Sequence, residues 1–286
     1  MSESLMEVSL EGGPKQPYHL VKPSSRPLLG AIAGGSMAVG AILFMHGGFP
    51  WLLIAGFLAV LGVMFIWWRD VIHESVVEKA HTPVVKIGLR YGMSLFIASE
   101  VMFFVAFFWA FFNSSLFPTA ADNGVWPPPG IEPVDPFHFP LLMTLVLLLS
   151  GTTATWAHHA LREGHNEAAK LALWCTIGLG VFFTMCQGYE YAHAEFGFRQ
   201  GIFGSTFYMA TGFHGFHVLV GTIFLCVCLW RTYRHHFTAD SHFGFEAAAW
   251  YWHFVDVVWL FLFIAIYFWG GLPHGTPINP AAPAAG

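Results

Sequence analysis

The stretch from Pro27 to Trp68 contains no Asp, Glu, Lys or Arg. As a single helix rising about 1.5 Å per residue it would be roughly 63 Å long, twice the ~30 Å hydrocarbon core of a bilayer. The chain must therefore fold back, and the run His46-Gly47-Gly48-Phe49-Pro50 is a turn signal. This stretch predicts two membrane-spanning helices, near 27–46 and 49–68.

The composition agrees with a lipid environment. Hydrophobic residues make up 56% of the chain and charged residues only 10%, against roughly 25% charged residues in an ordinary soluble domain. The net charge of -5 is small and the basic residues are scattered, so we expect no nucleic-acid partner.

Five further apolar segments complete an all-α, polytopic protein with seven transmembrane helices. We expect them near 86–117, 138–161, 169–193, 203–233 and 246–271. With seven helices in this order, eleven of the 12 Lys and Arg residues fall on one side of the membrane. Because basic loops stay cytoplasmic, we expect the N-terminus on the cytoplasmic (or matrix) side and the C-terminus opposite.

The connections suggest a division of the chain. We expect a soluble cytoplasmic or matrix-side tail, a two-helix hairpin, a polar connection, a five-helix bundle and a flexible C-terminal tail. Their predicted bounds are 1–26, 27–68, 69–85, 86–272 and 273–286.

Glu100 is the sharpest polar feature. It lies ten residues after Arg90, about 15 Å along a helix, and so near mid-bilayer if Arg90 marks the interface. A charged carboxylate there costs at least about 2.5 kcal/mol. Two interpretations stay open: a site that contacts protons, lipid or a neighbouring subunit, and a protonated carboxyl that is hydrogen-bonded to another helix.

Histidines also occur inside the apolar segments. His214 and His217 lie three residues apart on one helix, and His253 and Asp256 have the same spacing on the next. Facing imidazoles can bind haem or a metal, but interhelical hydrogen bonding is the favoured interpretation, with His253 and Asp256 pairing across their own turn. We read Glu190 as an interfacial acid in an aromatic belt.

Small residues predict close helix packing on two helices. The glycines that suggest it are Gly30, Gly34, Gly35, Gly178, Gly180 and Gly188.

Seven motifs occur in order between about Tyr18 and Gly271. They are WWRDV at 67–71, GLRYGM at 88–93, SEV at 99–101, FFWAF at 107–111, WAHH at 156–159, ATGFHGFH at 210–217 and HFGFEAAAWYWHFVD at 242–256. Together they resemble subunit III of the haem–copper cytochrome c oxidases of the aa3 type. The last motif alone is highly specific.

The resemblance implies a fold in which helices 1–2 are splayed from a bundle of helices 3–7, with phospholipid in the cleft between them. It implies an accessory, non-catalytic subunit without catalytic residues, metal or haem of its own. Haem a, haem a3 and copper would lie in partner subunits I and II. The complex would oxidise cytochrome c, reduce oxygen to water and pump protons, while this subunit binds phospholipid, stabilises subunit I and supports proton uptake.

The resemblance also assigns residues. Glu100 matches the buried carboxyl of helix 3 in the family. Seven residues match positions that contact lipid head groups or line the cleft: Trp68, Glu74, His81, Trp109, His217, Arg231 and His236. The chain departs from some relatives at Ala80, where a second histidine would precede His81.

A different class of function stays open from the residues alone. A self-contained transporter, or a b-type cytochrome that uses His214, His217 and His253, would also be a polytopic helical protein. Paired ionisable groups in broken helices, which would favour a transporter, are not evident. The alanine-rich tail favours the bacterial cytoplasmic membrane over the mitochondrial inner membrane as the location.

Overall fold

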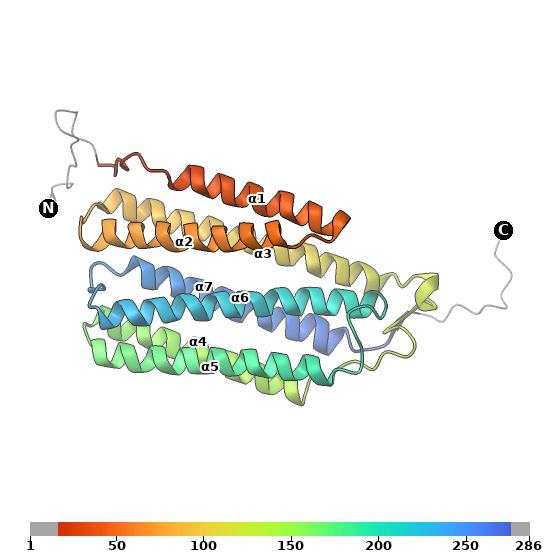
Figure 1. Cartoon of the computed structure of the whole chain (residues 1–286). Coiled ribbons are helices and arrows are strands. Elements are labelled where there is room, and N and C mark those ends of the chain that lie inside the picture. The colour runs from red at the N-terminus through yellow and green to blue at the C-terminus, as the bar shows by residue number, and fades with distance from the viewer. Residues whose placement is uncertain (1–16, 276–286) are drawn as a thin grey trace. The chain divides into compact units, whose positions relative to one another are not determined.

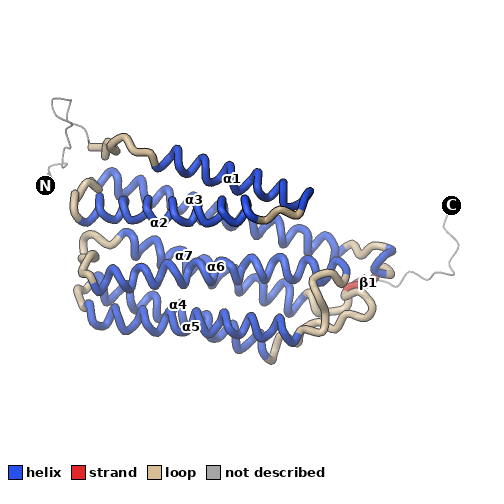
Figure 2. The backbone as a smooth tube through the Cα atoms, viewed as in Figure 1, coloured by secondary structure: helices blue, strands red, loops and turns tan. Residues whose placement is uncertain are grey.

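The computed structural model describes residues 17–275, and most of these residues are helical (Figures 1 and 2). The long helices are α1 (Arg26–Gly47), α2 (Trp51–Val76), α3 (Pro83–Leu116), α4 (Phe139–Arg162), α5 (Asn166–His193), α6 (Gly201–Tyr233) and α7 (Phe243–Leu262). Within residues 17–275, all seven have the length and the apolar composition needed to cross a membrane. The prediction of an all-α polytopic protein with seven helices is confirmed.

The helices that flank the first charged connection are longer than the sequence analysis expected. α2 runs to Val76 instead of ending near 68, and α3 begins at Pro83 instead of near 86. A helix can continue past the apolar core because its polar residues then face water, and the segment 69–76 contains no Gly or Pro. Pro83 suits the first turn of a helix, where no N–H bond is lost.

The chain divides into two compact units, and the boundary falls inside α3, between Tyr91 and Gly92.

The first unit is built on the antiparallel pair α1 and α2, whose backbones approach closely at Gly40 and Gly56. A Cβ atom at Gly56 would lie 2.5 Å from the backbone nitrogen of Met37, and one at Gly40 would overlap the backbone of Leu53. The α1 glycines named from sequence do not make this contact. A Cβ atom added at Gly34 or at Gly35 would meet open space, so the prediction of close packing was wrong at these two positions for contacts within the chain.

In the second unit, α4, α5, α6 and α7 form a four-helix bundle in which each helix contacts the next and α7 returns to α4 (Figure 1). Indole N–H groups of α7 cross-link the bundle to hydroxyls of α4. Trp252 Nε1 donates to Ser150 Oγ at 3.0 Å, and Trp259 Nε1 donates to Thr144 Oγ1 at 2.9 Å. Both indoles are fully buried, so these bonds satisfy polar groups that lipid could not.

One glycine predicted to allow close packing in this bundle does so. A Cβ atom at Gly180 on α5 would lie 2.7 Å from the Trp252 ring of α7. Added Cβ atoms at Gly178 and Gly188 would meet open space, so those two residues do not pack closely within the chain. The absence of a side chain at Gly180 therefore makes room for the indole that bonds Ser150.

The second-unit part of α3 packs through long aromatic side chains. Phe108 meets Phe261 with ring centroids 4.4 Å apart, and Phe104 meets Phe254 at 6.0 Å. Edge-to-face ring pairs of this kind add to the dispersion energy of the contact. The ring contacts hold α3 against α7 without close approach of the two backbones.

The end of α7 changes its winding. A π-helical segment, η2 (Phe263–Trp269), follows Leu262, and the Gly270 N–H donates to the Ala265 carbonyl at 3.0 Å, five residues back. Two short strands lie beyond, β1 (Val125–Trp126) and β2 (His274–Gly275), paired antiparallel. Trp126 Nε1 donates to the Gly270 carbonyl at 2.9 Å, so the loop after α3 is fixed to the end of α7. A 3-10 turn, η1 (Ala120–Asp122), precedes β1.

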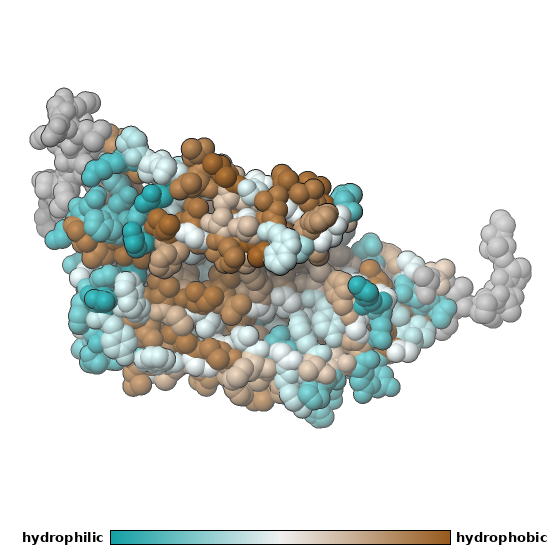
Figure 3. All heavy atoms as spheres, viewed as in Figure 1, coloured by the Kyte–Doolittle hydropathy of each residue, from teal (hydrophilic) through white to brown (hydrophobic). Residues whose placement is uncertain are grey.

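Hydrophobic side chains cover the outer surfaces of the helices. In Figure 3 they gather along the middle of the helices in view, and hydrophilic side chains gather near the helix ends. Leu95, Trp109 and Val257 are among the large apolar residues that are mostly exposed. Such a surface is expected where lipid is the solvent.

The glycine contact between α1 and α2 leads to a test. We expect Gly40→Ala to lower the free energy of unfolding by about 1–3 kcal/mol, because the new methyl group overlaps the α2 backbone. Gly34→Ala on the same helix meets open space and is the matched control, with an expected change within about 0.5 kcal/mol. Denaturation of the detergent-solubilised chain, followed by tryptophan fluorescence, measures both. Equal losses of unfolding free energy in the two variants would contradict the close contact between Gly40 and the α2 backbone.

Candidate functional site

Glu100 and His217 meet inside the second unit. Glu100 lies midway along α3 and His217 midway along α6, two helices long and apolar enough to span a membrane. Glu100 Oε2 is 2.9 Å from His217 Nε2. Their side chains are 17% and 3% exposed. The pair satisfies two polar groups that would each be costly alone in this environment.

The second nitrogen of His217 fixes how the pair shares protons. His217 Nδ1 lies 2.7 Å from the carbonyl oxygen of Phe213, and a carbonyl can only accept, so Nδ1 carries a hydrogen. His217 therefore offers Nε2 alone to Glu100, and one proton lies between Nε2 and Oε2.

Aromatic rings surround the imidazole of His217. Phe213 lies 4.5 Å away between ring centroids, Phe104 lies 5.2 Å away, and Tyr251 stacks at 6.1 Å with an interplanar angle of 19°. These rings come from α6, α3 and α7. These ring contacts fix the plane of the His217 imidazole.

His214, His253 and Asp256 each have a protein partner on at least one polar atom, although His214 Nδ1 and Asp256 Oδ1 have none among the described residues. His214 is fully buried, and its Nε2 lies 3.1 Å from the Val255 carbonyl on α7. His253 Nδ1 lies 3.4 Å from Asp256 Oδ2 across one turn, and His253 Nε2 lies 3.3 Å from Thr155 Oγ1 on α4. These contacts agree with the interpretation of the histidines as hydrogen-bonding groups.

Glu190 is buried, and the expectation of an interfacial acid in an aromatic belt was wrong. Its residue is only 5% exposed. The Tyr267 hydroxyl donates to Glu190 Oε1 at 2.7 Å, and Gln187 Nε2 donates to the same oxygen at 3.2 Å. The neighbouring tyrosines suggested an interface, but helix winding turns Glu190 inward between them.

A basic cluster lies where α6 ends, and it comprises Arg231, Arg234 and His236. Arg231 is buried, and its guanidinium carbon lies 4.3 Å from the Phe237 ring centre. Among residues 17–275, Arg231 Nε and His236 Nδ1 are buried atoms without a hydrogen-bond partner. Burial lowers the pKa of His236, and the positive charges of Arg231 and Arg234 lower it further.

The remaining sequence-predicted residues lie apart from this cluster. Trp109 is exposed and lines an apolar groove of about 750 Å³ between α3 and α7, together with Val105 and Val257. In the first unit, Trp68 is exposed and lines a smaller groove of about 430 Å³ between α1 and α2. Glu74 and His81 lie near each other at the charged end of α2, beside His19.

Comparison with known proteins identifies the family. The family described as "Cytochrome c oxidase subunit III" matches residues 16–271. A relative named "Cytochrome c oxidase subunit 3" from Marchantia polymorpha is 57% identical over 90% of this chain and 98% of its own length. Those from Tragelaphus oryx and Arabidopsis thaliana are each 55% identical, over 88% and 89% of this chain and 97% of their own lengths.

The chain belongs to the cytochrome c oxidase subunit III family. It is a membrane protein and an accessory subunit of an oxidoreductase complex that contains other oxidase subunits. The family resemblance expected from the motifs is thereby confirmed over most of the chain.

In this subunit III, sequence reasoning found Glu100 but not its partner. His217 was assigned to lipid, and nothing in the local sequence reveals a hydrogen bond between residues 117 positions apart. The three-residue spacing between His214 and His217 did indicate that both side chains lie on the same side of their helix. His19 was not considered, although two further ligand-type side chains converge on it.

The Glu100–His217 pair predicts non-additive effects on stability. Glu100→Gln and His217→Gln each disrupt the same hydrogen bond. The double variant should therefore lose less free energy of unfolding than the two single variants lose in sum. Double-mutant cycles inside membranes give couplings of about 0.6 kcal/mol on average and up to about 1.7 kcal/mol. Unfolding of the detergent-solubilised subunit measures the four variants of the cycle. A coupling of zero would mean that the two side chains do not interact.

Proposed function

We propose that this subunit III binds the phosphate of a phospholipid head group at the basic cluster of Arg231, Arg234 and His236, and that it thereby stabilises subunit I and supports proton uptake. The observation that carries the proposal is that two buried nitrogens without a hydrogen-bond partner among the described residues, Arg231 Nε and His236 Nδ1, belong to this one basic cluster. Buried polar nitrogens are costly without a partner, and a phosphate supplies acceptor oxygens.

The surroundings of Arg231 favour an anion. Arg231 lies against Phe237, and a Cβ atom at Gly244 would overlap its Nη1. Its guanidinium is thus held in place by packing, and a planar guanidinium matches phosphate oxygens in two parallel hydrogen bonds. Arg234, whose guanidinium carbon is 5.8 Å from the Trp230 ring centre, adds a second positive charge.

Apolar grooves in each unit suit acyl chains. The α3–α7 groove is lined almost wholly by apolar side chains, and Trp109 lies on its wall. Trp68 has the same place in the α1–α2 groove. Tryptophan is favoured where acyl chains meet head groups, which supports the assignment of both residues to lipid.

The histidines support a subunit without a redox centre of its own. His217 uses both ring nitrogens in hydrogen bonds to Glu100 and Phe213, and His214 bonds Val255. Ligation of haem would break these contacts, which weakens the alternative of a b-type cytochrome. We place haem a, haem a3 and copper in subunits I and II, with cytochrome c as the electron donor of the complex.

We further propose that the N-terminus lies on the cytoplasmic side of a bacterial inner membrane and the C-terminus on the periplasmic side. In the second unit, the α4–α5 and α6–α7 connections lie at one end (Figure 1), and Arg162, Lys170, Arg231 and Arg234 lie in these connections or in the adjoining helix ends. Basic residues at one end of a bundle mark the cytoplasmic side.

The phosphate proposal predicts loss of lipid. We expect Arg231→Gln combined with His236→Gln to lower the number of tightly bound phospholipids in the purified oxidase by at least one per complex, because the phosphate loses its donors. Phosphorus analysis of the delipidated complex, together with mass spectrometry of the extracted lipid, measures the loss.

Two variants act as controls for this experiment. Arg162→Gln removes a positive charge at the end of α4, on the same side, and should leave the lipid count unchanged. Arg231→Lys keeps the charge and should retain part of the lipid. An unchanged lipid count in the double variant would count against the site.

A second prediction concerns the intramembrane pair. Glu100→Gln should leave haem content and basal oxygen-reducing turnover nearly intact, because the hydrogen bond to His217 joins two helices and Glu100 belongs to no group of three ligand-type side chains among the described residues. Haem spectra and oxygen uptake by the purified oxidase measure both. Complete loss of oxygen reduction in a normally assembled complex would show that the pair takes part in the reaction.

A further inference from the structure

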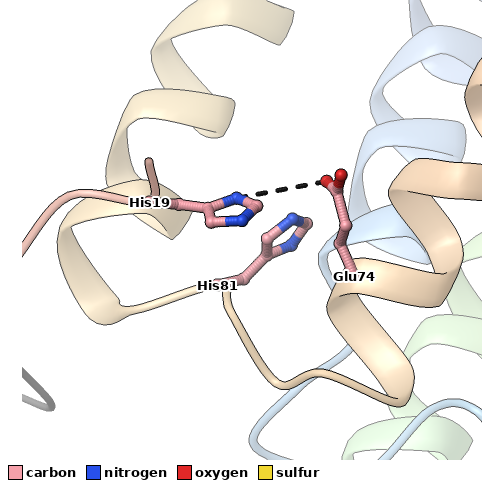
Figure 4. A group of neighbouring side chains, drawn as sticks. All are labelled: His19, Glu74 and His81. Carbon is pink, nitrogen blue, oxygen red and sulfur yellow. Dashed lines mark ion pairs between the residues drawn. The ribbon is translucent and has the colours of Figure 1, made fainter. Parts of the chain in front are cut away.

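Three ligand-type side chains converge at the charged end of the first unit. Figure 4 shows His19, Glu74 and His81 with their polar atoms turned toward one another. One ligand atom from each residue lies within 4.8 Å of the other two. His19 comes from the segment before α1, Glu74 from the last turns of α2, and His81 from the connection to α3.

The backbone brings these three residues together. Thr82 Oγ1 donates to the Pro17 carbonyl at 2.6 Å, which places the segment that holds His19 beside His81. The Ala80 N–H donates to the Glu74 carbonyl at 3.0 Å, which turns the chain back onto the end of α2. These two hydrogen bonds therefore bring the three side chains together, although none of the three side chains takes part in either bond.

The polar atoms of His19 and Glu74 are farther apart than a hydrogen bond allows. His19 Nδ1 is 4.0 Å from Glu74 Oε2, and the two imidazole centroids are 6.2 Å apart. In a tetrahedral zinc site, bonds of about 2.0–2.1 Å put ligand atoms about 3.4 Å from one another. For zinc to bind, the distances between the ligand atoms must shorten by about 1 Å, and rotation of the side chains can supply this change.

We propose that His19, Glu74 and His81 bind a divalent transition-metal ion, for which Zn²⁺ is the probe. Two imidazoles and one carboxylate are a known zinc ligand set, with water in the fourth position. Imidazole favours Zn²⁺ over Mg²⁺ or Ca²⁺, which prefer oxygen ligands. This inference goes beyond the proposed lipid function, and it gives Glu74 and His81 a role other than the lipid contact expected from sequence.

The local charges favour a cation over a phosphate. Glu74 places a carboxylate in the cluster, and a phosphate would be repelled by it. The neighbouring charges are already paired: Arg26 Nη2 lies 2.8 Å from Asp70 Oδ2, and Glu78 lies 3.9 Å from Lys22 and 3.8 Å from His73. Glu74 itself pairs with His19 of the cluster.

A bound ion would hold the segment before α1 against the α2–α3 connection. His19 lies on that segment, whereas Glu74 and His81 belong to the end of α2 and the turn that follows it. The metal would cross-link parts of the chain that the Thr82–Pro17 bond joins already. Lys79 is a convenient reporter, since it is exposed, is followed by Ala80 and precedes His81 by two residues.

The test uses the purified, intact oxidase equilibrated with buffered Zn²⁺ after treatment with a chelator. We expect His19→Gln, Glu74→Gln and His81→Gln each to lose one zinc per complex relative to the wild type, measured by elemental analysis. His73→Gln is the matched control, because His73 adjoins Glu74 but lies outside the cluster, and it should bind as much zinc as the wild type. Haem content verifies assembly of every variant.

Two further measurements keep the proposal falsifiable if a variant does not assemble. X-ray absorption at the zinc edge of the wild-type complex should show imidazole scattering, and this scattering should decrease in His81→Gln. Zn²⁺ should also slow tryptic cleavage after Lys79 in the wild type but not in His81→Gln. Equal zinc content in the wild type and the three variants, or an equal loss in His73→Gln, would overturn the proposal.

Discussion

The absence of water around the helices is the constraint on which the rest of this structure depends. Every buried polar group needs a partner from the chain itself, since lipid offers none. The bundle meets much of this requirement with bonds between helices: Trp252 to Ser150, Trp259 to Thr144, and His217 to Glu100. Each such bond also selects one rotation of a helix about its axis. Hydrophobic burial alone could not make that selection, because lipid tails are as apolar as the side chains they would replace.

The two units meet the constraint differently. α1 and α2 have few polar groups to satisfy, and they pack by backbone approach at Gly40 and Gly56. The second unit holds more polar groups, and its α3 segment contacts the others through phenylalanine rings and the Glu100 carboxyl. The second-unit part of α3 therefore combines a loosely packed backbone with one specific polar contact, a combination that suits a helix whose outer face meets lipid.

Much of the fold could be predicted from the sequence, because hydropathy is a local property. The uncharged stretch 27–68 and the turn at Gly48 indicated the first two helices, and the motifs indicated the family. Contacts across the bundle could not be predicted. Nothing near Glu100 identifies His217 as its partner, and the tyrosines beside Glu190 suggested an interface although the carboxyl points inward to Tyr267. The glycine contacts also depended on helix rotation, which sequence periodicity left undetermined on helices that are apolar all round.

The π-helical turn at the end of α7 gives the chain one residue to spare in this region. It accommodates one more residue than an α-helical turn would, and three consecutive residues, Ala265, Ile266 and Tyr267, are buried there. Deleting a single residue from the segment 263–269 would let it return to α-helical winding, and the residues that follow would keep nearly the same rotation about the helix axis. The Gly270 carbonyl would still face the Trp126 indole. A one-residue deletion in the regular part of α7 would instead turn everything that follows by about 100° and unfasten the outer loop, while leaving the hydropathy of the helix unchanged.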